Sequence, residues 1–256
     1  MKIATFNCNS VRSRLPIVLD WLAKESPDLL ALQETKVTDD QFPRELFEHA
    51  GWHLSVRGQK AYNGVAFVTK KPLQDVVLRL HPNDADEEAR FLMGRLDDVL
   101  FINTYVPQGY MPDSPKFEKK LRFFADLKTV LANIAAAGTP AVWMGDLNVA
   151  PTEEDLWDPK NNAEHVCFHP KARAAFEAAR GSGWADLFRE KVKGPGHYTF
   201  WDYLVPTNVA KNRGWRIDFL LGTAPMVKRL KKVWIDKEPR LKEKPSDHTF
   251  LVAEFE

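Results

Sequence analysis

The sequence predicts an α/β fold built from layers of sheet and helix, and three observations support that prediction. Roughly a dozen short apolar runs bounded by turn residues are typical of strands buried in a sheet. Only a few segments show helical periodicity, which excludes a helical bundle. Helical segments alternate with strands in the first half and again between Tyr105 and Trp184, which favours a layered sandwich over an all-β barrel.

The expected strands are short apolar runs that stop at turn residues. In chain order they are Lys2–Asn7, Leu29–Gln33, His53–Val56, Val65–Thr69, Val76–Leu80, Phe91–Leu96, Val99–Tyr105, Ala141–Gly145, His197–Trp201, Ile217–Gly222, Lys232–Ile235 and Thr249–Phe255.

Three helices are expected from apolar residues that recur on one helical face. The first has Pro16 at its start, where a missing N–H is tolerated. Its buried face consists of Ile17, Val18, Trp21 and Leu22. The second, Lys116–Ala137, is the longest periodic stretch and is stopped by Gly138. The third is Lys171–Arg180, closed by Gly181.

Length and composition indicate an ordinary globular protein. The chain has 256 residues, 44% of them hydrophobic and 28% charged, with a formal charge of +1. Because no linker-like tract divides it, we expect a single domain over residues 1–256. No run reaches the roughly 18 apolar residues of a membrane span, and no basic head with an apolar region opens the chain. We therefore expect a cytoplasmic protein with no signal peptide and no membrane partner.

Two further features concern the cysteines and the basic residues. Cys8 and Cys167 are the only cysteines, and we expect buried free thiols rather than a disulfide. Between Lys228 and Lys244, eight basic residues accompany three acidic ones. This segment either follows a phosphate backbone or is a solvated connection.

Polar residues recur where the apolar runs stop. Strand ends that share one rim of a sheet bring their side chains together, and the carboxylates, amides, phenol and histidine found here are typical of a metal-dependent hydrolytic site. Oxygen ligands of this kind favour Mg²⁺. The motifs are Phe6-Asn7, Leu32-Gln33-Glu34, Asn103-Thr104-Tyr105, Gly145-Asp146-Leu147-Asn148, Arg216-Ile217-Asp218 and Ser246-Asp247-His248.

Asp146 and Asn148 directly follow the strand Ala141–Gly145. In an extended chain their side chains point to the same side, where they would orient water and a phosphate oxygen. The small Gly145 would let backbone and ligand approach closely. The alternative is an ordinary turn, which Asp and Asn favour.

His248 is the side chain best placed to exchange protons near neutral pH. Asp218, within an apolar run, would be costly to bury alone and is the candidate to hold the histidine tautomer. The alternative is a purely structural Asp–His pair. Glu34 and Asn7 also follow strands, although each alone is compatible with an ordinary loop residue.

As an ordered set these motifs, with Tyr105-Val106-Pro107, resemble those of the exonuclease III type of AP endonuclease, in the endonuclease/exonuclease/phosphatase superfamily. The stretches Asp155–Lys160 and Tyr198–Trp201 resemble its DNA-repair branch. The resemblance implies a four-layer α/β/β/α sandwich, in which two mixed β-sheets are flanked by helices.

The resemblance also implies roles for individual residues. Asp146 would activate the attacking water, and His248, steered by Asp218, would polarise the phosphate. Asn148 and Tyr105 would contact the phosphate or the nucleophile. Mg²⁺, for which Mn²⁺ can substitute, would be held by Glu34, Asn7, Asp247, Asp146 and Asn148.

Substrate contacts follow from the same resemblance. Phe200, Trp215 and Ile217 match a pocket for an extrahelical abasic sugar, and the alternative is that these three are simply core. Gln108 and Asn162 would add substrate contacts. The chain departs from the pattern at Asn9, where some relatives carry aspartate, and at His165, where an asparagine would contact DNA. The loop before the second helix lacks an arginine, so a wedge there would be Tyr110 or Met111.

The implied function is Mg²⁺-dependent cleavage of duplex DNA 5′ to abasic sites, with 3′–5′ exonuclease or 3′-end trimming activity. The partner would be double-stranded DNA with an abasic site or a 3′ terminus, bound by a monomer. Two alternatives stay open: another phosphodiesterase or phosphatase of the superfamily, and a non-catalytic DNA-binding relative. The second predicts the loss of site residues.

Overall fold

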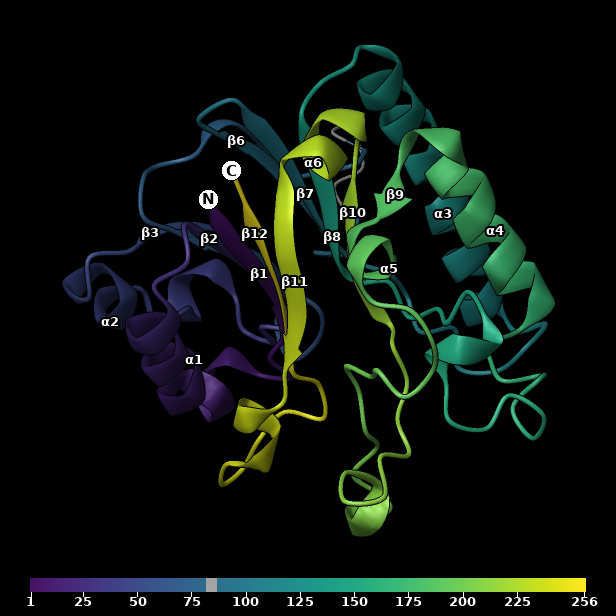
Figure 1. The fold of residues 1–256 in the computed structure, drawn as a ribbon. Helices are drawn as coiled ribbons and strands as arrows, with labels where there is room; N and C mark the ends of the chain where they lie inside the picture. Colours follow the sequence, from purple (N-terminus) through teal and green to yellow (C-terminus); the bar gives the residue numbers. More distant parts are fainter. Residues whose placement is uncertain (82–86) are drawn as a thin grey trace.

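The computed structural model describes residues 1–81 and 87–256, and its chain forms two six-stranded sheets packed face to face between helices (Figure 1). The strand orders are β11-β12-β1-β2-β4-β3 and β5-β6-β7-β8-β10-β9. Both sheets are mixed, because β1–β2 and β7–β8 are parallel pairs among antiparallel ones. The predicted four-layer sandwich is confirmed.

The first sheet contains both ends of the chain. Its strands are β1 (Lys2–Asn7), β2 (Leu29–Gln33), β3 (His53–Arg57), β4 (Val65–Thr69), β11 (Leu230–Asp236) and β12 (Phe250–Phe255). The second sheet contains β5 (Gln74–Val77), β6 (Phe91–Leu96), β7 (Val99–Tyr105), β8 (Ala141–Asp146), β9 (Ala185–Asp186) and β10 (Asp218–Gly222).

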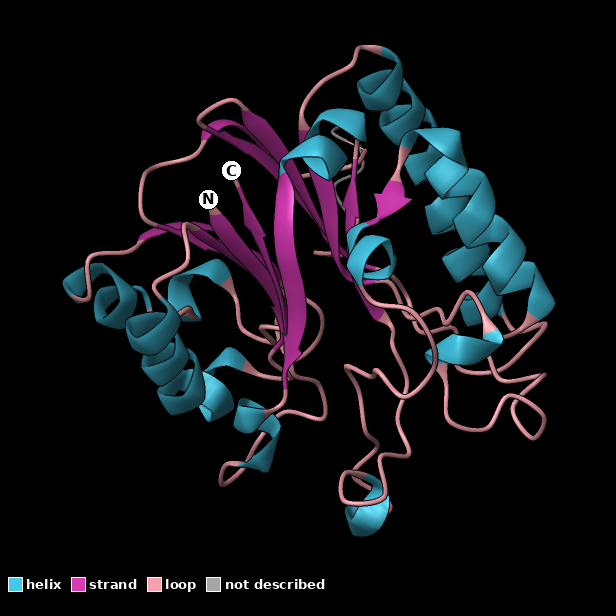
Figure 2. Ribbon diagram, viewed as in Figure 1, coloured by secondary structure: helices cyan, strands magenta, loops and turns pink. Residues whose placement is uncertain are grey.

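The helices are α1 (Val11–Glu25), α2 (Arg44–His49), α3 (Pro115–Ala136), α4 (Pro170–Arg180), α5 (Leu187–Lys191) and α6 (Ala224–Arg229). Helices α1 and α2 cover the outer face of the first sheet, and α3 and α4 cover that of the second, whereas α5 and α6 contribute side chains to the layer between the sheets (Figure 2). Short 3₁₀ turns are η1 (Asp39–Gln41), η2 (Glu153–Asp155), η3 (Gly181–Gly183), η4 (Pro206–Asn208) and η5 (Glu238–Leu241). Within the described ranges, none of the helices combines the length and apolar composition that crossing a bilayer requires.

Three apolar layers hold the sandwich together. Fully buried Phe67 and Phe101 meet between the two sheets. Trp21 of α1 packs on the first sheet, and Phe124 of α3 packs on the second. Burying such side chains stabilises the fold by about 1.5–3 kcal/mol each. These layers explain why the strands read as continuous apolar runs: most strand residues are covered on both faces.

Several elements predicted from the sequence differ from those in the structure. His197–Trp201 is not a strand, because its residues bond to different segments: Thr199 and Phe200 donate to Trp215, and Trp201 donates to Asp247. Such isolated bridges build no ladder.

Several other predicted elements differ from the structure by one or two residues at their ends, and two predictions differ in a way that has a structural cause or a larger shift. Pro16 lies inside α1 rather than at its start, because the side chain of Ser10 accepts from the Ser13 N–H and caps the helix earlier. The predicted strand Val76–Leu80 is instead Gln74–Val77.

The basic segment does not form one face. β11 runs antiparallel to β12, so Arg229 lies beside Glu256, whose backbone N–H donates to the Arg229 carbonyl, whereas Asp236 pairs with Phe250 at the opposite rim. The segment therefore spans both rims of the first sheet, and only its second half, from Lys237 onward, lies at the rim where β12 begins.

Buried amides fix the relative position of the two sheets. Asn103 on β7 donates to the backbone carbonyls of Leu32 and Ala66, at 3.1 and 3.0 Å. Gln33 on β2 donates to the Asn103 amide oxygen at 2.8 Å. Leaving a buried amide unpaired costs about 1–3 kcal/mol. These bonds therefore resist sliding of one sheet over the other.

Candidate active site

Chain direction brings the predicted motifs to one rim, the lower end of the strands in Figure 1. Four strands end there, with Asn7, Gln33, Tyr105 and Asp146 as their last residues. β10 and β12 run the opposite way and begin there, because Asp218 pairs with Asp146 and Leu251 pairs with Thr5. The rim therefore combines side chains from both sheets.

A cavity of about 490 Å³ opens at this rim. Eleven of the thirteen predicted site residues line it, and the other two, Asn7 and Asp218, are fully buried at its floor. The lining members are Glu34, Tyr105, Gln108, Asp146, Asn148, Asn162, Phe200, Trp215, Ile217, Asp247 and His248. The structure thus brings together every residue that the sequence proposed, whereas their individual roles remain predictions.

Asn7 links the two sheets at the centre of the site. Its Nδ2 donates to Glu34 Oε1 and to Asp146 Oδ2, each at 2.8 Å. Its Oδ1 accepts the backbone N–H of Asn9 at 3.0 Å, which fixes the orientation of the amide. Asn7 therefore turns a donor, rather than a ligand oxygen, toward the carboxylates.

A chain of ionisable groups crosses the floor. His248 Nδ1 lies 2.8 Å from Asp218 Oδ2, and His248 Nε2 lies 3.7 Å from Asp146 Oδ2. Burial alone would lower the pKa of His248, but Asp218 and Asp146 outweigh it and raise the pKa to about 10. Burial raises the pKa of Asp146 to about 7, against the opposing effect of His248. The histidine is therefore protonated at neutral pH and can donate a proton or a hydrogen bond.

Two more groups have environments that suit phosphate chemistry. Burial, Glu34 and Asp146 raise the pKa of Tyr105 well above its usual value, so the phenol keeps its proton. Arg90 stacks over the Tyr105 ring at 4.7 Å and donates to its carbonyl at 3.2 Å. Tyr105 is thus a fixed hydrogen-bond donor at the cavity wall.

Asn148 reaches Asp146 by a route that the sequence did not predict. β8 ends at Asp146, and Asn148 adopts a left-handed turn with φ 48° instead of continuing the strand. Its backbone N–H bonds to Asp146 Oδ1 at 2.9 Å, and its Nδ2 bonds to Val106 O at 3.0 Å. The turn that Asp and Asn favour is therefore present, and it lies at the site itself. Gly145 is required for the neighbouring backbone rather than for a ligand, because a Cβ there would lie 2.0 Å from Thr104 O.

The donor set fits a divalent cation. In the described part of the chain, the ion pairs of Glu34, Asp146, Asp218 and Asp247 are limited to two cationic partners, Lys36 and His248. Lys36 Nζ lies 2.8 Å from Glu34 Oε2 and holds the pKa of Glu34 below its usual value despite burial. With Asp146 ionised, two negative charges stay uncompensated beside oxygen atoms, which suits Mg²⁺ or a similar hard ion.

Among the described residues, Asp146, Asp218 and His248 also offer ligand atoms within 4.8 Å of one another. This trio is a poor metal site, because one histidine nitrogen is bonded to Asp218 and the other is protonated. Glu34, together with the carboxylates nearest to it, is the better candidate.

Phe200, Trp215 and Ile217 contribute both to the apolar core and to the cavity lining, and their role toward a substrate stays a prediction. Trp215 is 9% exposed and Ile217 is 4% exposed, and both pack in an apolar cluster with Phe117 and Leu156. All three nevertheless line the cavity. Trp215 and Ile217 are core residues, Phe200 is partly buried against them, and together they form an apolar wall of the cavity.

Sequence reasoning missed part of the lining. Trp157, Cys167, Asp202, Asn208 and Arg213 also face the cavity. The segment between Trp201 and Gly214, which carries η4 and reaches furthest down in Figure 1, contains an exposed apolar run. There Leu204 is 87% exposed, between Tyr203 and Val205 at 41% and 46%. The run Tyr203-Leu204-Val205 inside a polar loop was the available signal.

An ion-pair network supports the apolar wall from behind. Arg216, between Trp215 and Ile217, is 1% exposed and lies 2.8 Å from both Asp155 and Asp186. Arg189 contacts the same Asp155 oxygen at 2.6 Å. Burial would raise the pKa of Asp155, but Arg216 and Arg189 hold it below its usual value. This contribution to stability is present above the unfolded pKa of about 4 and is lost as pH falls through the folded value.

Replacing Arg216 with Met is expected to lower the free energy of unfolding by about 3–5 kcal/mol, because buried carboxylates lose their partner. Urea unfolding at neutral pH measures this change. The matched control is Arg213→Met, an exposed arginine stacked on Trp157, whose effect should stay within about 0.5 kcal/mol. Equal effects of the two substitutions would show that the network does not stabilise the fold.

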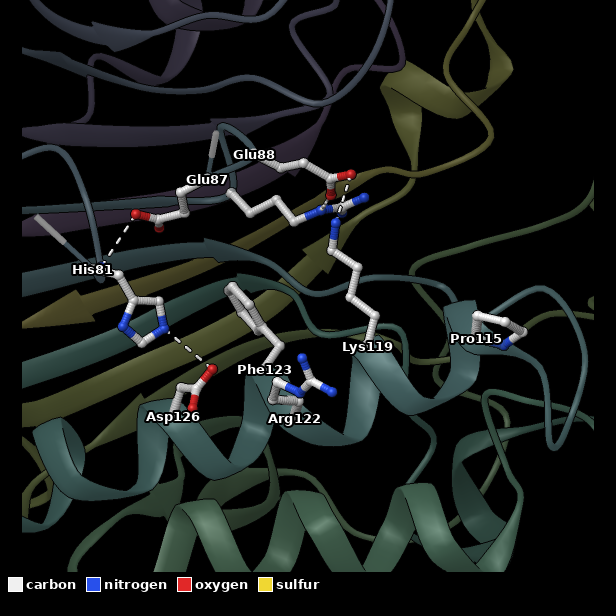
Figure 3. Close-up of a pocket in the computed structure, with 9 residues that line it drawn as sticks. His81, Glu87, Glu88, Pro115, Lys119, Arg122, Phe123 and Asp126 are labelled. Atoms are coloured by element: carbon white, nitrogen blue, oxygen red, sulfur yellow. Dashed lines mark hydrogen bonds and ion pairs between the residues drawn. The ribbon is translucent and has the colours of Figure 1, made fainter. Parts of the chain in front are cut away.

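A second cavity, of about 630 Å³, lies beside α3 and contains none of the predicted site residues (Figure 3). Its charged side chains are largely paired with one another: His81 with Asp126 at 3.1 Å and Lys119 with Glu88 at 2.8 Å. Paired surface charges of this kind do not indicate catalysis.

Comparisons with known proteins agree with this geometry. The sequence pattern described as the Endonuclease/Exonuclease/phosphatase family matches residues 4–248. Exodeoxyribonuclease III of Haemophilus influenzae is 34% identical, with all of both chains covered. An AP endonuclease from Archaeoglobus fulgidus superposes with a TM-score of 0.92 at 40% identity, covering 100% of this chain and 99% of that one. The D146N form of the 3′ phosphatase NExo from Neisseria, bound to a product DNA hairpin, superposes with a TM-score of 0.95 at 37% identity. The shares of the two chains that are covered are again 100% and 99%.

Proposed function

Because the chain belongs to the endonuclease/exonuclease/phosphatase family, we propose that it cleaves duplex DNA 5′ to abasic sites and trims 3′ termini, with a divalent cation as cofactor. It is a hydrolase of the exodeoxyribonuclease III and AP endonuclease type. One observation supports the substrate proposal: the Asn7 amide bonds to both Glu34 and Asp146. The protonated His248 and an apolar wall line the same cavity. We further propose that it acts as a monomer.

The residues divide the reaction between them. Asp146 accepts the proton of the attacking water, and Asn148, whose Nδ2 already bonds to Val106 O and Asp146, turns its Oδ1 toward that water. His248 and Tyr105 donate to the phosphate oxygens as negative charge develops. A bound Mg²⁺, held by Glu34 with Asp247 nearby, would stabilise charge on the phosphate and on the leaving 3′ oxygen. Water adds to phosphorus, the P–O3′ bond breaks, and a 3′-hydroxyl is left.

The wall supports selection of an abasic nucleotide. Phe200, Trp215 and Ile217 form an apolar surface within the cavity that contains the carboxylates. A nucleotide without a base costs least to rotate out of the duplex, and its sugar fits an apolar surface that a polar base would not. Gln108 and Asn162, at the same cavity, are the proposed polar contacts of the flanking phosphates.

The exposed side chain of Leu204 is proposed to enter a groove of the duplex. Replacing Leu204 with Ser is expected to weaken binding of abasic duplex by about tenfold, because an inserted apolar side chain loses its contact with the bases. The control is Leu46→Ser, which alters another exposed leucine, on α2 and outside the candidate site. Fluorescence anisotropy with labelled duplex at fixed salt measures both affinities. If both variants bind like the parent chain, Leu204 has no role in binding.

A panel of end-labelled DNAs tests the function. It contains duplexes with an abasic site, a recessed 3′ terminus or a 3′-phosphate, together with inositol phosphate. We expect Mg²⁺-dependent nicking 5′ to the abasic site and slower release from the 3′ ends. Hydrolysis of inositol phosphate without DNA cleavage would instead favour another phosphodiesterase of the superfamily.

A further inference from the structure

The structure assigns a positioning role to Lys120, whose buried ammonium joins three loops that carry active-site residues. This inference deepens the proposed function and rests on it for its kinetic test. It concerns a residue that lies behind the cavity lining and contacts no substrate position.

Lys120 occupies a core position of α3. The buried face of this helix consists of Phe117, Lys120, Phe124, Leu127 and Leu131, a spacing at which an apolar side chain is expected. Lys120 is 0% exposed. A cation is rarely found fully buried unless it is bonded, so its retention there requires a specific partner.

The partners are three backbone carbonyls. Nζ donates to Asn148 O at 2.6 Å, to Val166 O at 2.8 Å and to Gln108 O at 3.1 Å. A neutral amine has only two protons, so three donated bonds require the ammonium form. Among the described residues, no carboxylate lies within ion-pair distance of Nζ. The charge therefore serves the backbone and not a salt bridge.

Each carbonyl belongs to a loop of the site. Gln108 follows β7 and lines the cavity, Asn148 forms the left-handed turn after β8, and Val166 lies between His165 and Cys167, which also line it. These loops come from positions up to 58 residues apart along the chain. Side chains at a reacting centre must be held to within fractions of an ångström, and a single tetrahedral donor common to all three loops provides that constraint.

The left-handed conformation of Asn148 makes this constraint specific to the site. A non-glycine residue in that region needs support from its surroundings. The Asn148 side chain is anchored by Val106 and Asp146, and Lys120 anchors the carbonyl on the other side of the same residue. Loss of the ammonium therefore releases the turn that orients Asp146.

The test compares Lys120→Met with Lys128→Met, an exposed lysine further along the same helix. Hydrogen exchange followed by mass spectrometry is recorded for peptides covering 106–110, 146–151 and 164–169. We expect Lys120→Met to speed exchange in these three segments together, with the sheets unchanged, and to lower kcat on abasic duplex by about 100-fold, with a smaller change in KM. Lys128→Met should match the parent chain in both measurements.

Two outcomes would overturn the assignment: turnover of folded Lys120→Met within threefold of the parent chain, or exchange of the three segments unchanged. If Lys120→Met does not fold, Lys120→Arg decides. It keeps the charge but displaces the donors, so the same segments should exchange faster and kcat should fall, and parent-like behaviour would exclude a positioning role. If the parent chain cleaves no DNA in the panel, the proposed function fails, and the exchange measurement alone decides the role of Lys120.

Discussion

A chain carrying Asp146→Asn is expected to nick abasic duplex about 10³-fold more slowly than the parent chain. Its thermal unfolding midpoint should lie within a few degrees of the parent's. The carboxamide keeps the volume of the side chain, and its single oxygen can still accept from Asn7, but it cannot accept the proton of the attacking water. It also removes a charge that burial disfavours, since burial raises the pKa of Asp146 to about 7. Single-turnover rates at saturating Mg²⁺ measure the chemical step.

The matched control for this prediction is Asp202→Asn. Asp202 lines the same cavity, but its contact is to the backbone N–H of Leu204 rather than to the catalytic groups. We expect its rate to stay within about threefold of the parent, as for a surface substitution. A comparable loss in both variants would mean that cavity charge, and not proton transfer at Asp146, controls the rate.

The second large effect concerns the cation. Excess EDTA is expected to abolish cleavage, and added Mg²⁺ should restore it, because the carboxylates around Glu34 outnumber their cationic partners. Glu34→Gln should raise the Mg²⁺ concentration for half-maximal rate by about 10–100-fold. Rate measured against free Mg²⁺ gives this value directly.

Glu88→Gln is the control for the cation experiment, because Glu88 lies in the second cavity beside Lys119 and Arg90. Its Mg²⁺ dependence should equal that of the parent. Cleavage that persists undiminished in chelator would dispose of the metal proposal and leave the His248–Asp146 pair as the main source of catalysis.

Much of the fold follows from local pattern, because strands covered on both faces must be apolar. β1, β2, β4, β6 and β7 have the predicted bounds. His197–Trp201 has a similar pattern, but its backbone bonds are divided between Trp215 and Asp247. The apolar pattern of one segment does not show with which other segments it pairs. The start of α1 was also not predictable from its apolar pattern. The helix is capped by the side chain of Ser10, which precedes that pattern, so Pro16 lies inside the helix.

The site was predictable in composition and less so in its connections. Polar residues after apolar runs marked Glu34 and Asp146, but the bond that joins both to Asn7 depends on how two sheets meet. Lys120 and Leu204 were overlooked because the first looks like a helical surface lysine and the second like a loop residue. The residue roles, the single domain, the monomeric state and the cytoplasmic location stay predictions.

The division of the site between two sheets has a consequence during synthesis on the ribosome. Asn7 and Glu34 emerge early, whereas His248 emerges only after nearly all other strands, and β12 must then insert between β1 and β11. A nascent chain that has not passed this point lacks His248, the proposed proton donor, and the neighbour of β1. Such a nuclease is expected to be harmless to DNA until translation has delivered that final strand.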